Sequence, residues 1–65
     1  MYKEITSGHT FIQEDDEFIK VYDSVGSITG LEPVYISNFK AQSQKQFEME
    51  VAYILVYHLD RDSMS

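Results

Sequence analysis

Alternation of apolar and polar residues runs through most of the chain and predicts a small sheet. Stretches rich in β-branched and aromatic residues predict strands at 2–6, 10–13, 18–25 and 34–40. Gly26, Gly30 and Pro33 interrupt this pattern. Glycine accepts turn conformations and proline cannot donate to a ladder, so we expect a loop over 26–33. The polar segment 41–46 fits either a hairpin connection or a short helix.

The strongest periodicity lies in residues 47–59, where every odd position is apolar or aromatic. A helical period is present as well, since Phe47, Val51 and Ile54 recur at a spacing near 3.6. β-branched and aromatic residues dominate the segment, which favours a strand. The fold class we expect is therefore mainly β, a small antiparallel sheet of three to five strands with room for one short helix.

A strand over residues 47–59 has a consequence for assembly. It would extend roughly 43 Å at about 3.3 Å per residue, whereas a globule of this size has an expected radius of gyration of about 11 Å. Such a strand must bend or continue into a second subunit, and its second apolar face needs cover. We therefore expect a homodimer with these interface residues: Ala52, Tyr53, Ile54, Val56 and Tyr57.

Negative charge is concentrated in the first half of the chain. The net charge is −6, and residues 1–32 carry seven acids against two bases. Four consecutive acids fall between two predicted strands, so we expect them at an exposed hairpin connection. On a strand, Glu48 and Glu50 would share one side about 6.6 Å apart, a spacing similar to that of successive phosphates in a nucleic acid. The candidate partner-binding surface comprises Glu14, Asp15, Asp16, Glu17, Asp23, Glu48 and Glu50.

Several classes of function are disfavoured by what the sequence lacks. There is no cysteine for a disulfide or thiolate metal site, and the acids do not have the spacing of an EF-hand. No Gly-x-Ser-x-Gly or phosphate-binding loop occurs, so we expect no catalysis, no cofactor and no metal. No apolar run is long enough to span a membrane. Acidity disfavours direct binding to nucleic acid or anionic lipid, because both are polyanions.

The acidic cluster, the small size, the absence of cysteine and the β-rich body together resemble the small host-takeover proteins of bacteriophages, some of which mimic DNA. The resemblance covers the whole chain in character and involves no shared motif. It implies a non-catalytic inhibitor in the host cytoplasm that occupies the DNA-binding surface of a basic host protein, such as the nucleoid protein HU. One alternative is a structural or adaptor module that binds through residues 47–59. Another is that the acids only keep a small protein soluble.

Overall fold

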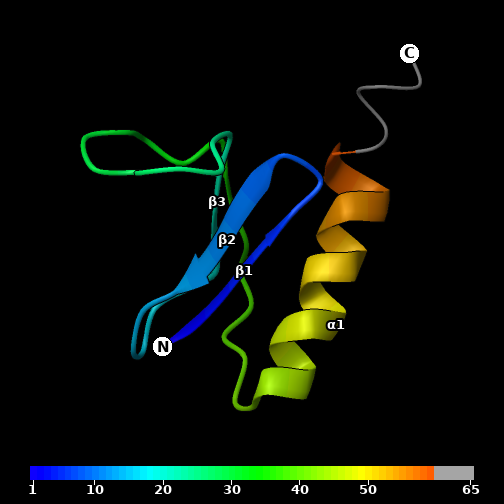
Figure 1. Cartoon of the computed structure of the whole chain (residues 1–65). Helices are drawn as coiled ribbons and strands as arrows, with labels where there is room; N and C mark the ends of the chain where they lie inside the picture. Colours follow the sequence, from blue (N-terminus) through cyan, green and yellow to red (C-terminus); the bar gives the residue numbers. More distant parts are fainter. Residues whose placement is uncertain (60–65) are drawn as a thin grey trace.

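Within the described part of the chain, the fold consists of a four-stranded antiparallel sheet and one helix (Figure 1). The structure is a computed structural model and describes residues 1–59. The elements are β1 (Tyr2–Thr6), β2 (His9–Gln13), β3 (Lys20–Tyr22), β4 (Tyr35–Ile36), α1 (Gln44–Ile54) and a π-helical continuation, η1 (Leu55–Leu59). The expected fold class, a small antiparallel sheet with a short helix, is confirmed.

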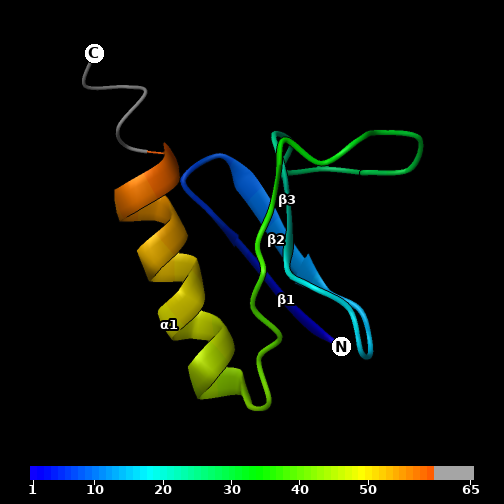
Figure 2. The same cartoon turned by 180° about the vertical axis from the view of Figure 1, so that it is seen from behind.

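The strands lie in sequence order, β1-β2-β3-β4, each antiparallel to its neighbour. Ser7 and Gly8 join β1 to β2 with φ values of 54° and 76°, the pair of positive angles typical of a type I′ two-residue hairpin. The ladders of β3 and β4 are shorter than predicted. The loop between them projects away from the helix in both views (Figures 1 and 2), and its position confirms the loop expected over 26–33.

The predicted strand at 47–59 is wrong, because these residues lie in α1 and η1. Ser43 caps the helix by accepting a hydrogen bond from the Gln46 backbone N–H at 3.2 Å. The residues with helical spacing, Phe47, Val51 and Ile54, are the ones buried. A strand of roughly 43 Å would exceed the longest dimension of the molecule, which is 34 Å. Burial of one helical stripe therefore outweighs the β preference of the individual residues.

One face of the sheet packs against α1, and the core lies between them (Figure 2). The buried apolar residues are Phe11, Ile19, Val21, Ala41, Phe47, Val51 and Ile54. Tyr2 adds an aromatic contact, with its ring centroid 5.6 Å from that of Phe47. Ile54 is fully buried in the single chain, so it belongs to this core and not to the dimer interface predicted for it. The opposite face of the sheet leaves Ile5 and Ile36 about half exposed.

Candidate functional site

Residues 14–17, here called the acidic turn, connect β2 to β3 as the sequence predicted. The Glu17 N–H donates to the Glu14 carbonyl at 3.1 Å, which closes a four-residue turn. Asp16 adopts a left-handed conformation with φ of 63°, a region that aspartate tolerates better than most residues. All four side chains are exposed. The backbone thus holds four carboxylates in water at one end of the sheet.

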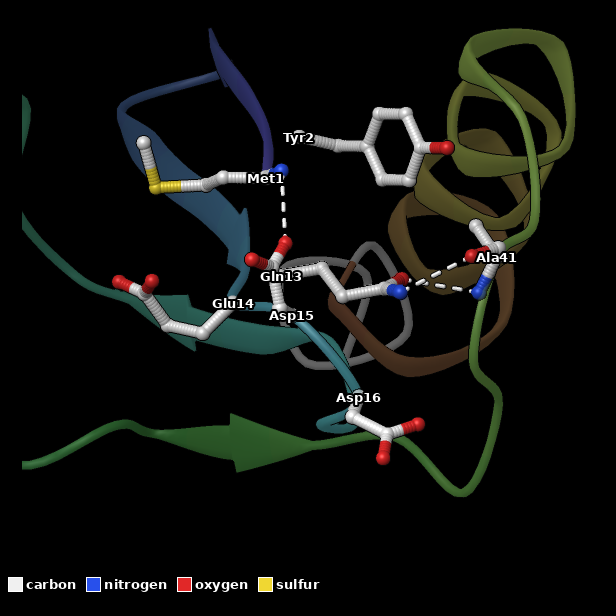
Figure 3. A pocket seen from close by; sticks show the side chains of 7 residues that line it. All are labelled: Met1, Tyr2, Gln13, Glu14, Asp15, Asp16 and Ala41. Atoms are coloured by element: carbon white, nitrogen blue, oxygen red, sulfur yellow. Dashed lines mark hydrogen bonds and ion pairs between the residues drawn. The ribbon is translucent and has the colours of Figure 1, made fainter.

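A buried glutamine anchors the base of this turn (Figure 3). Gln13 ends β2, and its side-chain Nε2 donates to the Ala41 carbonyl at 3.0 Å. Its Oε1 accepts the Ala41 backbone N–H at 2.8 Å. The two hydrogen bonds tie the turn to the segment that leads into α1. We call this pair of bonds the Gln13 clamp. No sequence pattern indicates it, because the Gln13 side chain binds backbone atoms of Ala41.

The charges of the acidic turn are partly compensated. The N-terminal amine lies 3.1 Å from Asp15, and Lys20 lies 3.2 Å from Glu17. Both carboxylates stay largely solvated, with the Asp15 side chain 95% and the Glu17 side chain 51% exposed. Ion pairs so exposed contribute only about 0–1 kcal/mol. No ion pair involves Glu14 or Asp16 within residues 1–59, so the turn keeps a strongly negative character.

The carboxylates do not form a straight row. Figure 3 shows those of Glu14, Asp15 and Asp16 pointing in different directions around a shallow hollow of about 240 Å³. The hollow is lined by Met1, Tyr2, Gln13, Glu14, Asp15, Asp16 and Ala41. The turn therefore offers a rounded acidic tip.

Asp23 was predicted to extend the acidic surface but lies apart from the tip. It follows β3, whereas the acidic turn precedes β3, so the strand separates them along its length (Figure 1). Its carboxylate lies 3.6 Å from Nε2 of His9. The structure therefore brings residues 14–17 together and leaves Asp23 at the other end of β3.

Glu48 and Glu50 do not have the strand geometry expected of them. Both belong to α1, where positions two apart differ by about 200° around the axis, so the two carboxylates cannot point the same way. Glu48 is exposed and accepts a hydrogen bond from Gln44 Nε2 at 2.8 Å. Glu50 is half-buried, and its burial raises the pKa of the carboxyl above its ordinary value, while nearby His58 opposes the rise. The prediction that Glu48 and Glu50 have a phosphate-like spacing is therefore wrong.

The other predicted interface residues lie on the outer side of the helix. Ala52, Tyr53, Val56 and Tyr57 are all exposed, and the rings of the two tyrosines lie 4.7 Å apart between centroids. His58 stacks on Tyr35 at 4.6 Å and so links the helix end to β4. The last turn of the helix therefore carries an aromatic cluster that period-2 spacing could not reveal.

Three further findings concern metal binding, membrane spans and similarity to known proteins. Within residues 1–59 no three histidine, aspartate or glutamate side chains gather as a metal-binding group. No helix in this part of the chain has the length and apolar character needed to cross a membrane. Comparison with known protein families, curated proteins and solved structures finds no match to this chain.

Proposed function

We propose that this chain is a non-catalytic binding protein that places its acidic turn in the basic, DNA-binding surface of a host protein and so excludes DNA. The observation that carries the proposal is the set of four exposed carboxylates in one turn, anchored at its base by the Gln13 clamp. A fixed tip loses less conformational entropy on binding than a mobile acidic tail.

Long-range charge supports the same proposal. The chain carries a net charge of −6, which attracts a basic surface and speeds encounter. Screening limits this attraction to about 8–10 Å at physiological salt, so binding should weaken as salt is raised. Asp23, which follows β3, and the acids of α1 add to the overall field but do not extend the tip into a continuous ridge.

The test compares two triple variants with the same net charge. One neutralises the tip with Glu14→Gln, Asp15→Asn and Asp16→Asn, which preserves the Glu17–Lys20 pair. The control neutralises three exposed acids elsewhere with Asp23→Asn, Glu32→Gln and Glu48→Gln. Each is used to capture basic DNA-binding proteins from a bacterial lysate at low and moderate salt, and purified HU is the first partner to assay directly.

We expect the control variant to capture a DNA-binding protein and the tip variant to lose it. DNA should compete with the unmodified chain for that partner. Equal capture by both variants would show that net charge alone causes binding, and it would refute a specific role of the tip. Recovery of no DNA-binding protein by the unmodified chain would refute the proposal altogether.

A second candidate, an adaptor module that also dimerises, is favoured by the exposed helix face. Met49, Tyr53, Val56 and Tyr57 are 49–63% exposed and recur at helical spacing. The small residue Ala52 lies among them and would let two helices approach closely. In this function a second copy covers the face, and the acids serve solubility. Sedimentation at micromolar concentration should then give a dimer, and Val56→Ser should yield a monomer; a monomeric unmodified chain would exclude it. An adaptor would also keep its partner in the tip variant.

A further inference from the structure

A second hollow lies between α1 and the segment that precedes it. It measures about 400 Å³ and is lined by Phe39, Gln46, Met49, Glu50 and Tyr53. Its wall is mostly apolar, and its volume falls in the range of about 300–1,000 Å³ that is usual for small-ligand sites. Only one of these side chains carries a charge, so the hollow combines two aromatic rings, a thioether, an amide and a single carboxylate.

Glu50 supplies the charged group of this hollow. No hydrogen bond or ion pair within residues 1–59 involves its carboxylate. Lys40 follows Phe39 in the wall of the hollow, but its Nζ lies over the Phe18 ring at 5.1 Å from the centroid. Partial burial disfavours the charged form of Glu50, and its pKa is raised accordingly. A cation in the hollow would compensate the Glu50 carboxylate for the hydration that it loses there.

We propose that this hollow binds an arginine side chain of a partner protein, with the alkyl stem against Met49 and Tyr53 and the guanidinium on Glu50. A guanidinium is planar and weakly hydrated, stacks on aromatic faces and pairs with a carboxylate through two hydrogen bonds. A neutral apolar side chain would leave the carboxylate desolvated without a partner. An ammonium group is more strongly hydrated, so it loses more hydration free energy on entering an apolar hollow.

The net charge of the chain favours a different protein over a second copy of this chain as the source of the arginine. Two chains of net charge −6 repel each other, and each chain holds one arginine, Arg61. A basic protein offers many arginines and is attracted at long range. The site goes beyond the proposed function because the hollow and the acidic turn share no lining residue. The two can therefore succeed or fail separately.

The probe is N-acetyl-arginine methylamide, titrated into the full chain while backbone amide resonances are followed by NMR. Its citrulline counterpart has nearly the same shape but no charge. We expect the arginine probe to shift the resonances of the residues that line the hollow, and to bind about tenfold more tightly than the citrulline probe. Glu50→Gln should remove that difference, whereas Glu48→Gln, on the exposed side of α1, should keep it.

Five results would overturn the proposal. The first is equal binding of the two probes, and the second is an arginine preference that persists in Glu50→Gln with the native spectrum retained. The third is the absence of any shift at the hollow. The fourth is a set of shifts at the hollow that depends on protein concentration alone, and the fifth is tighter probe binding in Arg61→Gln. Either of these last two would show that the chain itself fills the site.

Discussion

The Gln13 clamp sets the position of the acidic turn, and Gln13→Leu tests how much it contributes. Gln13 is 5% and Ala41 6% exposed. Leucine would break both hydrogen bonds and leave the N–H and C=O of Ala41 buried without partners. Each orphaned group costs about 1–3 kcal/mol, and the larger apolar side chain offsets part of this. The free energy of unfolding should fall by about 2–4 kcal/mol.

That loss is large for a chain of this size, since one small core rarely supplies more than about 3–5 kcal/mol. Urea unfolding followed by far-UV circular dichroism measures it. With a slope of about 1 kcal/mol per M, the midpoint should fall by about 2 M or more. Gln42→Leu makes the same substitution at an exposed position one residue beyond Ala41, and should stay within about 0.5 kcal/mol. A Gln13→Leu variant as stable as this control would refute the argument.

The variant Gln13→Glu tests the two hydrogen bonds of the clamp separately. A carboxylate keeps an acceptor for the Ala41 N–H but places charge against the Ala41 carbonyl. A protonated carboxyl can donate to that carbonyl. The folded state therefore binds the proton more tightly than the unfolded state, so the pKa of the new carboxyl should be raised by folding. Stability of the variant relative to the unmodified chain should then increase as pH falls through that pKa.

The remaining predictions concern the helix. Phe47→Ala empties a fully buried position and should cost about 3–5 kcal/mol, whereas Met49→Ala, at a 63% exposed position, should cost far less; urea unfolding compares them. Ser43→Ala removes the cap and should cost about 1 kcal/mol in the same assay. His58→Gln should raise the pKa of Glu50 further, because His58 lowers it now, and a carboxyl NMR titration should show the change. An unchanged Glu50 pKa in that variant would show that His58 does not affect the Glu50 carboxyl.

Local patterns predicted the first half of the chain well. Residues 2–6 and 10–13 lie in β1 and β2, and the run of acids forms the turn that their position between two strands implied. The third and fourth strands exist but are short. Backbone bonds from Val34 to Val21 and from Ser37 to Ile19 continue the pairing irregularly, so the extended pattern persists where the regular ladder does not.

Residues 47–59 show why periodicity alone could not decide the rest. Their odd positions are apolar, yet Phe47, Val51 and Ile54 also fall on one helical stripe. A capping signal upstream was available, since Ser43 and Gln46 have the serine-x-x-glutamine spacing of a helix start. In the structure Gln46 Oε1 accepts the Gln42 N–H at 2.8 Å. That local sequence, and the limited width of a small domain, carry more information than the β preferences of the residues that follow.

The helix also changes what a partner must look like. A strand would have aligned Glu48 and Glu50 with other acids into a long ridge, which suits an extended basic groove. The observed molecule has a rounded acidic tip at one place and a concave site with one carboxylate at another. A tip requires a basic recess in the partner, whereas a hollow requires a projecting basic side chain. A partner that used both would lose affinity in the tip variant and in Glu50→Gln. High salt should reduce the affinity difference between the tip variant and the unmodified chain, because salt screens the exposed tip. The difference caused by Glu50→Gln should persist, because the hollow is partly shielded from screening ions.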